Sequence, residues 1–368
     1  MNIPLGEVDR TLARLWADTA KGDAHASTST LVVCCATPDE LPRARAAIAP
    51  FVTTRPCRTV TVVCYPGAPP AITARVALHA NTLRDAEPVG DDIELDVRGA
   101  EARTWVPSTL LGLRKPDVPL YVWWVGDLPD NDRLFDHLVE EADVAAVHSC
   151  DMDLRDLEQL SRLIELSQGA YVMTDLNWVR LRAWQELTAR FFDDPAARAH
   201  TRAMRELTVR FTPRENVVEP LSTQAALFAG WIATCLGWDT HNPRWSVSTD
   251  GSSTATLKQG EGEAVTVRFI AEEREGVYPG AIHLVGLAAP QAHFEVARSS
   301  DDPLVICWSG EGEGLLIPSQ CLRIGTPDEP KMLARALERP SRDTVFERSL
   351  AAAARLVAPV APKAPENV

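Results

Sequence analysis

The second half of the chain is organised around the sequence YVMTDLNWVRLRAWQELTARFFD, residues 171–193. It contains no proline or glycine, and Thr174 and Asp175 carry short oxygen-bearing side chains of the kind that cap helix starts. The stretch therefore predicts a helix of about five turns. Its apolar residues share one side of the helical wheel and its charged residues share the other, except for Arg180, which projects from the apolar side.

An arginine on the apolar side of a helix requires a physical explanation. It needs an acidic partner, a ligand or a path along which its side chain reaches water. The plainest interpretation is a core helix in which Arg180 forms a structural ion pair. Ligand or partner binding is the alternative.

Length and charge limit the classes of protein that fit the chain. With 368 residues it is long enough for two domains, each with its own core. The formal net charge of −14 disfavours nucleic acid or an anionic membrane as the main partner. No apolar stretch approaches the ~20 residues that span a bilayer, and the N-terminus has no signal-peptide pattern. We expect a cytoplasmic protein with no membrane contact.

Continuous apolar runs of strand length alternate with helical segments upstream of residue 170. The strands are expected at 30–36, 58–65, 118–125 and 143–148, and the helices at 39–51, 101–114, 131–142 and 154–168. This alternation predicts a mostly parallel sheet with helices on both faces. Two further segments, near 76–80 and 93–97, alternate apolar with polar residues, which indicates a half-exposed antiparallel pair at an edge.

The pattern changes downstream. Residues 222–238 form a helix that is apolar almost all round, with Gly237 at the position of a C-terminal cap. Short β segments between 244 and 324 predict an antiparallel sheet packed on that helix. They are expected at 244–249, 253–258, 264–271, 281–286, 292–297 and 304–308. The predicted fold class is thus α/β, with an N-terminal α/β domain at 1–170 and a C-terminal α+β domain at 171–357. The Pro/Ala-rich tail, 358–368, is expected to be disordered.

Motifs that carry chemistry are absent from the sequence. There is no P-loop, GxGxxG, HExxH or GxSxG motif. Asp151 and Asp153 are spaced as in some metal sites, but capping the following helix is their plainer use. The eight cysteines make no CxxC pair, so reduced core thiols are expected, with a redox-switching pair as the alternative. We therefore expect no catalytic residues, no metal and no cofactor.

Tryptophan is unusually frequent, with ten residues against four tyrosines. Trp123 and Trp124 are adjacent in a predicted strand, so their side chains point to opposite faces of the sheet. Tryptophan and arginine often carry the binding energy of protein interfaces, although core packing is the plainer role of each tryptophan.

Four segments together resemble one family. DLNWVRLRAW at 175–184 resembles the DLAWTRLTPWR-type signature of the OpcA family of glucose-6-phosphate dehydrogenase assembly proteins. PLYVWWVG at 119–126 is similar to that family's PVVxWWPG segment, with Val125 in place of proline. RPCRTV at 55–60 resembles its HPCR-V stretch, and FAGWIATCLGW at 228–238 resembles its LLAGWLASRLGW helix. The four occur in family order.

The resemblance implies a non-catalytic assembly factor or allosteric activator. Such a protein binds glucose-6-phosphate dehydrogenase and promotes its active oligomer in the oxidative pentose phosphate pathway. The residues that we expect to contact the partner are Trp123, Trp124, Asp175, Trp178, Arg180, Arg182 and Trp184.

An α/β enzyme or ligand-binding protein acting on a nucleotide or sugar phosphate is the alternative. It would use Asp151 and Asp153 with a metal, or Arg180 and Arg182 on a phosphate.

Overall fold

The computed structural model describes residues 2–19, 27–81, 87–129, 132–214, 220–248, 252–260, 262–325, 328–338 and 341–361. The chain forms two compact units. Unit 1 comprises Met1–His148, Ser167–Leu176 and Asp328–Arg342, and unit 2 comprises Ser149–Leu166, Asn177–Pro327 and Asp343–Val368. Unit 1 thus includes two short segments from the region in which the sequence predicts the second domain.

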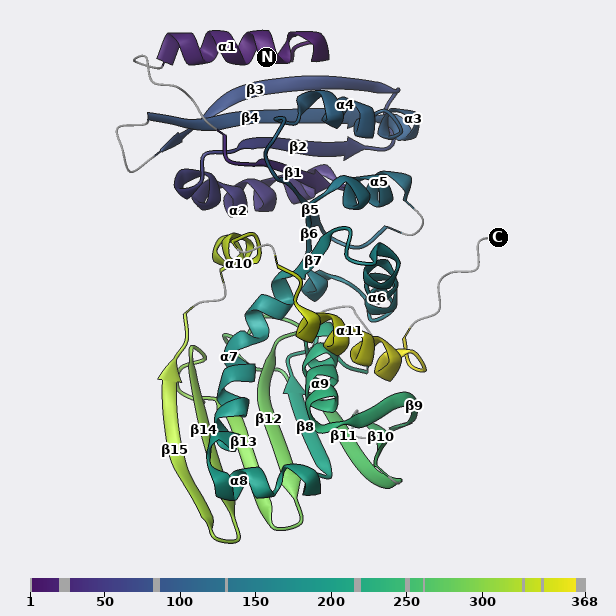
Figure 1. Ribbon diagram of the computed structural model, residues 1–368, viewed down its shortest axis with the longest axis vertical. Helices are drawn as coiled ribbons and strands as arrows, with labels where there is room; N and C mark the ends of the chain where they lie inside the picture. Colours follow the sequence, from purple (N-terminus) through teal and green to yellow (C-terminus); the bar gives the residue numbers. More distant parts are fainter. Residues whose placement is uncertain are drawn as a thin grey trace. The chain divides into compact units, whose positions relative to one another are not determined.

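Unit 1 is built on a seven-stranded sheet (Figure 1). The strand order is β3 (Ala71–Asn81), β4 (Glu87–Arg98), β2 (Arg58–Tyr65), β1 (Thr30–Cys35), β5 (Leu120–Val125), β6 (Val144–Val147) and β7 (Val172–Asp175). All neighbours are parallel except β3 and β4, which pair antiparallel. From β4 to β7 this is the order of doubly wound sheets, in which the winding direction reverses between β1 and β5.

Helices of unit 1 pack on this sheet and on one another. They are α1 (Val8–Thr19), α2 (Leu41–Thr54), α3 (Gly99–Arg103), α4 (Val106–Leu113), α5 (Arg133–Glu141) and α10 (Glu329–Ala336), with 3-10 turns η1 (Leu5–Glu7) and η2 (Pro38–Glu40). Helix α10 joins unit 1 from far along the chain by packing on α2 (Figure 1). Arg55, after α2, donates from Nη1 to the carbonyl of Leu337 at the end of α10, 3.1 Å away.

Two sequence-based expectations for unit 1 need correction. Strand β7 lies within the stretch that we expected to be helical. Because it is only four residues long, its sequence shows no alternation of apolar and polar residues. Strand β4 is not half-exposed, because Glu94 and Asp96 on its polar side are buried beneath arginines. Arg75 bonds both carboxylates, and Arg45 also bonds Glu94.

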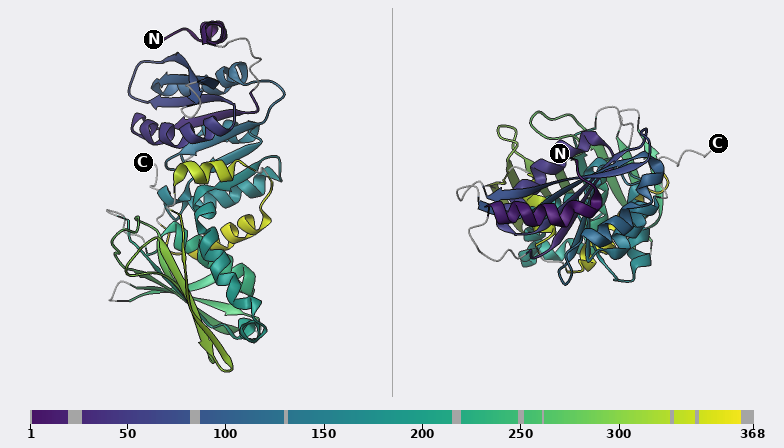
Figure 2. Two further views of the ribbon diagram at one scale, coloured as in Figure 1. Left: turned by 90° about the vertical axis from the view of Figure 1, so that its left-hand side faces the viewer. Right: turned by 90° about the horizontal axis from the view of Figure 1, so that it is seen from above.

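Unit 2 is built on an eight-stranded sheet. Its order is β15 (Leu315–Arg323), β14 (Val305–Gly312), β13 (Ala292–Arg298), β12 (Ile282–Ala289), β8 (Glu206–Phe211), β11 (Glu263–Ala271), β10 (Ser253–Gln259) and β9 (Trp238–Val247). Only the β8–β11 pair is parallel. Burial alternates along β8 and β13, and Figure 2 shows the helices of this unit gathered on one side of the sheet. The fold class predicted from the sequence is confirmed.

The helices of unit 2 are α6 (Asp156–Ser167), α7 (Leu176–Arg190), α8 (Pro195–Ala199), α9 (Thr223–Leu236) and α11 (Thr344–Val357), with 3-10 turns η3 (Ser149–Asp151), η4 (Phe191–Asp193) and η5 (Thr201–Ala203). Ser222 caps α9 by accepting from the N–H of Ala225. Gly237 ends the helix in the left-handed conformation, as the sequence predicts. Helix α9 packs tightly on α11. A Cβ at Gly230 would lie 2.3 Å from the carbonyl oxygen of Ser349, so the close approach requires a glycine there.

The expectation that all cysteines are reduced is wrong for one pair. Cys307 and Cys321 face each other on β14 and β15 and form a disulfide. We expected no strand at the position of β15. The sequence therefore did not predict that Cys307 and Cys321 would face each other. The tail expected to be disordered lies, from residue 362 onward, outside the described residues.

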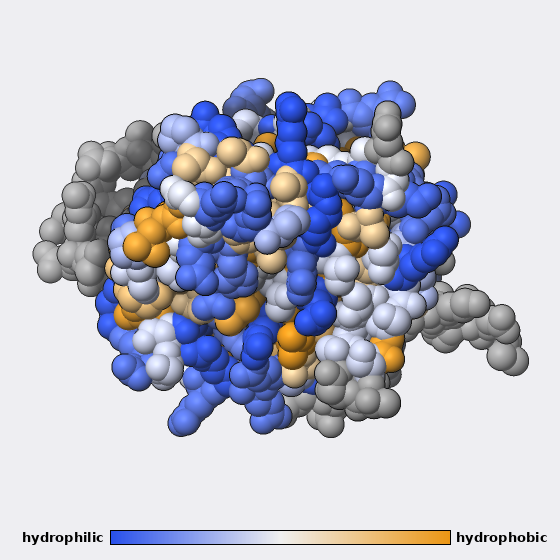
Figure 3. All heavy atoms as spheres, turned by 90° about the horizontal axis from the view of Figure 1, so that it is seen from below, coloured by the Kyte–Doolittle hydropathy of each residue, from blue (hydrophilic) through white to orange (hydrophobic). Residues whose placement is uncertain are grey.

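The surface mixes polar and apolar side chains. Figure 3 shows one face of the molecule, on which hydrophobic residues are scattered among hydrophilic ones. Within the described ranges, no helix combines the length and the hydropathy needed to cross a membrane.

Candidate functional site

The structure divides the seven predicted contact residues between the two units. Trp123, Trp124 and Asp175 belong to unit 1, and the other four, all on α7, belong to unit 2. Five of the seven side chains are 9% exposed or less: Trp123, Trp124, Asp175, Trp178 and Trp184. Arg180 is half-buried and Arg182 is exposed. Burial assigns the five to packing in this structure, and their contact with a partner stays a prediction.

Trp178 connects the start of α7 to the start of α11. Its indole N–H donates to Asp343 Oδ2 at 3.1 Å, and its ring centroid lies 5.5 Å from that of Phe346. Asp343 in turn caps α11 by accepting from the N–H groups of Val345 and Phe346. The first tryptophan of the signature therefore aligns two helices of unit 2.

Arg180 has no carboxylate partner among the described residues. Its Cζ lies 4.2 Å from the centroid of the Tyr278 ring, and its Nη1 donates to Cys150 Sγ at 3.4 Å. The Nε atom is buried, with no hydrogen-bond partner in the part of the chain that the structure describes. The structural ion pair expected from the sequence is thus absent there, and an aromatic ring takes its place.

A buried polar network continues from Tyr278. The Gln224 side-chain N–H₂ donates to the Tyr278 hydroxyl at 2.8 Å and to Asn177 Oδ1 at 2.7 Å. Gln224 Oε1 accepts from the N–H of Ile282 at 2.9 Å, and Asn177 donates to Ser149 Oγ at 3.1 Å. The network fixes α7, α9 and β12 to one another. Sequence reasoning missed Tyr278 and Gln224, although a glutamine inside the apolar α9 was a usable signal.

A second arginine lies in the same region of unit 2. Arg298 is 7% exposed, and its Cζ lies 5.6 Å from the Trp184 ring. It donates to the carbonyl oxygens of Ile282, at 3.3 Å, and Pro303, at 2.5 Å. Burial lowers the pKa of Arg298, and the positive charges of Arg274 and Arg180 act in the same direction. Two guanidinium groups therefore share a region without a salt-bridged carboxylate among the described residues.

In unit 1, the turn after β1 is the place where doubly wound folds hold a dinucleotide pyrophosphate on backbone N–H groups. Here the Glu40 side chain accepts from the N–H of Ala36 at 2.7 Å and of Thr37 at 3.4 Å. Gly126, at the end of β5, approaches Glu40 so closely that a Cβ there would lie 2.4 Å from Oε1.

A carboxylate of the protein thus uses the N–H groups that a phosphate would need. Burial raises the pKa of Glu40, although the two backbone donors act to lower it, and Asp127 adds a further negative charge nearby. A phosphate at this turn would meet negative charge. The residues present do not fit the pyrophosphate of a dinucleotide.

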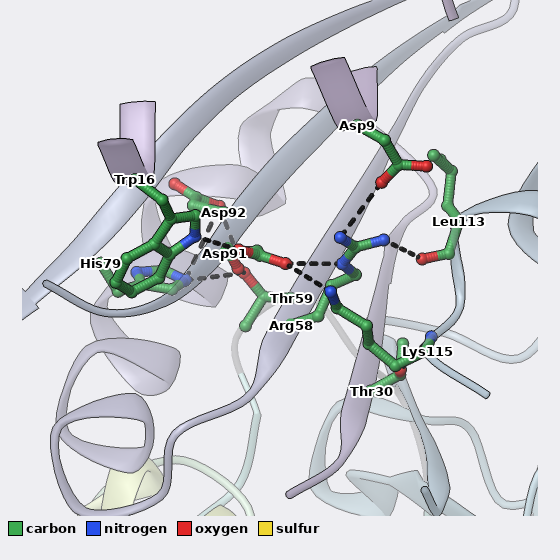
Figure 4. A network of polar contacts seen from close by, with 10 residues as sticks. All are labelled: Asp9, Trp16, Thr30, Arg58, Thr59, His79, Asp91, Asp92, Leu113 and Lys115. Atoms are coloured by element: carbon green, nitrogen blue, oxygen red, sulfur yellow. Dashed lines mark hydrogen bonds and ion pairs between the residues drawn. The ribbon is translucent and has the colours of Figure 1, made fainter. Parts of the chain in front are cut away.

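The opposite end of the parallel strands carries a network of ion pairs (Figure 4). Arg58, the first residue of β2, bonds Asp91 Oδ2 from Nε at 2.8 Å and the carbonyl of Leu113 from Nη1 at 2.7 Å. Trp16 Nε1 donates to Asp91 Oδ1 at 2.7 Å, and Lys115 Nζ lies 3.7 Å from Oδ2. Although burial acts to raise it, the Trp16 and Arg58 donors hold the pKa of Asp91 below its usual value.

A cavity of about 460 Å³ adjoins this network, between α1 and the segment after α4. Its charged walls are already paired: Arg58 with Asp91 and Asp9, Lys115 with Asp91, and Arg114 with Glu141. The second arginine of RPCRTV therefore ties α1 to the beginnings of the strands, which is a structural role.

The metal site considered for Asp151 and Asp153 finds no support in the geometry. Asp153 Oδ1 lies 3.3 Å from Arg214 Nη2. The N–H of Asp153 donates to Asp156 Oδ2 at 2.9 Å, at the start of α6. Across the described ranges, no group of three or more His, Cys, Asp or Glu side chains is placed to hold a metal ion.

Comparison with known protein families gives two matches. Residues 49–162 match the glucose-6-phosphate dehydrogenase subunit N-terminal domain, and residues 171–350 match the C-terminal domain of the same subunit. The chain belongs to the OpcA family of glucose-6-phosphate dehydrogenase assembly proteins. The resemblance seen in the four sequence segments is confirmed.

Curated relatives carry the same family name. A putative OxPP cycle protein OpcA of Nostoc punctiforme is 24% identical over 82% of this chain and 65% of its own length. Its counterpart in Synechococcus elongatus is 26% identical over 82% of this chain and 68% of its own length. The chain thus spans about two thirds of these OpcA relatives.

Two solved structures are similar to this chain. The transcriptional regulator Gal80p of Kluyveromyces lactis is 9% identical, covers 94% of this chain and 91% of its own, and has a TM-score of 0.50. KijD10, a 3-ketoreductase from Actinomadura kijaniata in complex with NADP and TDP-benzene, is 12% identical, with coverages of 91% and 97% and a TM-score of 0.48. At 9% identity the likeness to Gal80p concerns the fold alone.

Proposed function

We propose that this OpcA-family chain binds glucose-6-phosphate dehydrogenase in the cytoplasm and promotes its active oligomer in the oxidative pentose phosphate pathway. The observation that carries the proposal is the match of both domains of the dehydrogenase subunit, in order, over 49–162 and 171–350. No nucleic acid or membrane is part of the proposed complex. The formal net charge of −14 supports that choice.

The chain is proposed to act without catalysing a reaction. The supporting observation is Glu40, whose carboxylate accepts from the N–H groups of Ala36 and Thr37. A doubly wound sheet that served as a nicotinamide-dependent oxidoreductase would need those donors for a phosphate. An assembly factor has no such need.

Population shift is the proposed mechanism of activation. A protein that binds one oligomer or conformation of an enzyme better than its competitors stabilises that state by the difference in binding free energy. The effect on the dehydrogenase is then saturable, and its midpoint follows the affinity of the complex.

Arg182 is the proposed contact among the seven predicted residues. It lies on α7 with its side chain exposed, whereas Trp178 and Trp184 of the same helix are buried. Exposed arginines are frequent among residues that dominate the energy of an interface. Arg190, also exposed on α7, offers a matched control.

The test uses purified dehydrogenase from the same organism. This protein is titrated into the enzyme while the rate of NADP⁺ reduction and the mass of the complex, by light scattering on a sizing column, are recorded. Co-elution with saturable activation is expected. If both proteins are folded and neither co-elution nor a rate change occurs, the proposal is wrong for this chain.

A charge reversal tests the contact separately. Arg182→Glu is expected to raise the half-saturating concentration about tenfold or more. The variant loses a favourable contact, and its carboxylate would repel an acidic group of the partner that the arginine contacts. Arg190→Glu is expected to leave it within about twofold. Equal effects of the two variants would show that Arg182 does not contact the dehydrogenase. That result would not bear on whether the dehydrogenase is the partner.

A further inference from the structure

We propose that Arg180 and Arg298 form the centre of an anion-binding site in unit 2 that takes the phosphoryl group of a small phosphorylated metabolite. Arg180 lies over the Tyr278 ring, and Arg298 lies over the ring of Trp184, one turn along α7 from Arg180. Arg274 donates to the backbone carbonyl of Arg298 and adds a third positive charge. The inference concerns this chain alone and does not depend on the dehydrogenase.

In the part of the chain that the structure describes, the arginines of this region contact rings, a thiol and carbonyl oxygens rather than carboxylates. Among the described residues, Arg180 contacts an aromatic ring and a thiol, and Arg298 contacts two carbonyl oxygens and an indole ring. Arg274 donates from Nη2 to the carbonyls of Arg298, at 2.8 Å, and Ser299, at 2.7 Å. None of the three forms a salt bridge within the described part of the chain. Burying cations without a counter-charge is unfavourable, so a bound anion would stabilise the folded unit.

Arg180 keeps most of its donors uncommitted. A guanidinium has five N–H donors, and the hydrogen bond that Arg180 makes from Nη1 is to Cys150 Sγ. Its buried Nε has no hydrogen-bond partner among the described residues, and the residue as a whole is half-buried. The planar fork of uncommitted N–H groups matches the oxygens of a phosphate, which guanidinium groups bind in bidentate fashion.

The surroundings hold Arg180 in place for such a ligand. The Tyr278 ring under the guanidinium is fixed by its hydroxyl, which accepts from Gln224 at 2.8 Å. Gln224 is itself fixed by Asn177 and by the backbone of β12. Tyr278 thus positions Arg180 without neutralising it. A prepared cationic group loses less entropy when the anion binds.

Unfolding of the isolated protein tests the site. The melting temperature is measured while inorganic phosphate replaces chloride at constant ionic strength, and again with a sugar phosphate. For the wild type we expect a saturable rise of about 5 °C near saturation. A response to the sugar phosphate at lower concentration than to phosphate identifies an ester as the ligand, and equal midpoints identify free phosphate.

Substitutions on α7 provide the control. Arg180→Met loses the guanidinium N–H donors, so it is expected to fold but to show no change of melting temperature with phosphate. Arg180→Lys keeps the positive charge but not the planar set of guanidinium N–H donors. The phosphate concentration at half of the melting-temperature rise is therefore expected to increase about tenfold. Arg182→Met, exposed two residues away, is expected to respond like the wild type. A wild type that does not respond, or an Arg180→Met variant that responds equally, would overturn the proposal.

Discussion

The guanidinium carbon of Arg180 lies 4.2 Å from the centroid of the Tyr278 ring. This contact replaces the ion pair that an arginine on the apolar side of a helix would ordinarily need. The ring belongs to the segment between β11 and β12, about a hundred positions from Arg180 in a chain of 368 residues, so only folding brings the two together.

The ring and the hydroxyl of Tyr278 have separable effects. Tyr278→Phe keeps the ring beneath Arg180 and removes one acceptor of Gln224, whose N–H₂ still donates to Asn177. We expect it to lower the free energy of unfolding by about 1 kcal/mol. Tyr278→Leu also removes the cation–π contact and should lose about 2–3 kcal/mol. Urea unfolding measures both, and equal losses would show that the ring adds nothing.

Gly230 sets the approach of α9 to α11. A Cβ at this position would lie 2.3 Å from the carbonyl oxygen of Ser349 and 2.7 Å from the amide nitrogen of Ala353, and neither backbone atom yields cheaply. Gly230→Ala is expected to lower the free energy of unfolding by about 2–3 kcal/mol.

A helical glycine in open space is the control for Gly230. Gly112, in α4, has no neighbouring atom within 4 Å of the place that a Cβ would occupy, so Gly112→Ala should stabilise by up to about 1 kcal/mol. Thermal unfolding of the two variants should shift in opposite directions. If both melting temperatures shifted in the same direction, the contact between α9 and α11 would not be what determines the effect of Gly230→Ala.

Glu329 makes the docking of α10 on α2 dependent on pH. Burial acts to raise its pKa, but the His148 and Arg43 partners outweigh burial and lower the pKa from 4.5 to about 2. Because the folded value lies below the unfolded one, the carboxylate stabilises the fold above pH 4.5 and loses that contribution as the pH falls towards 2. The contribution at neutral pH is up to about 3 kcal/mol.

Glu329→Gln should therefore have a lower free energy of unfolding than the wild type at pH 7. The difference between the two proteins should become smaller below pH 4.5. Chemical denaturation at several pH values measures the difference. Glu338→Gln, an exposed glutamate just after α10, should follow the wild type at every pH. A gap that stays constant down to about pH 3.5 would contradict the assignment of the lowered pKa to Glu329.

The Cys307–Cys321 disulfide closes the β14–β15 hairpin over a separation of 14 residues. A cross-link of this span restricts the unfolded chain, so replacing both cysteines with serine should lower the free energy of unfolding by about 2–3 kcal/mol. A reductant should have the same effect on the wild type and none on the double variant. Cys235→Ser, at an exposed free cysteine, should leave the reductant response intact.

Elements with a continuous local pattern were predictable from the sequence. The buried strands β1, β2 and β5 appear as apolar runs, and Ser222 and Gly237 mark the two ends of α9. Strand β7 was not predictable, because four residues cannot show a period and the helical pattern of α7 follows at once. Strand β4 looked half-exposed because its buried carboxylates find their arginines on other elements.

The candidate site was predictable only as a set of unusual residues. Arg180 stood out on its helix, but Tyr278, Gln224 and Arg298 come from distant segments with no shared motif. Glu40 likewise looked like an ordinary residue near a helix start. Only its hydrogen bonds to Ala36 and Thr37, and its contact with Gly126 at the end of another strand, show why the turn does not suit a phosphate.

The sequence by itself determined the α/β class, most elements and the OpcA family, since these depend on hydrophobic periodicity, caps and motifs within short segments. Tertiary structure alone decided the burial of the signature tryptophans, the disulfide and the partner of Arg180. Each of these depends on contacts that folding makes between separate helices and strands. Local propensity carries no information about such pairings, because strand register and helix packing are fixed by the whole core.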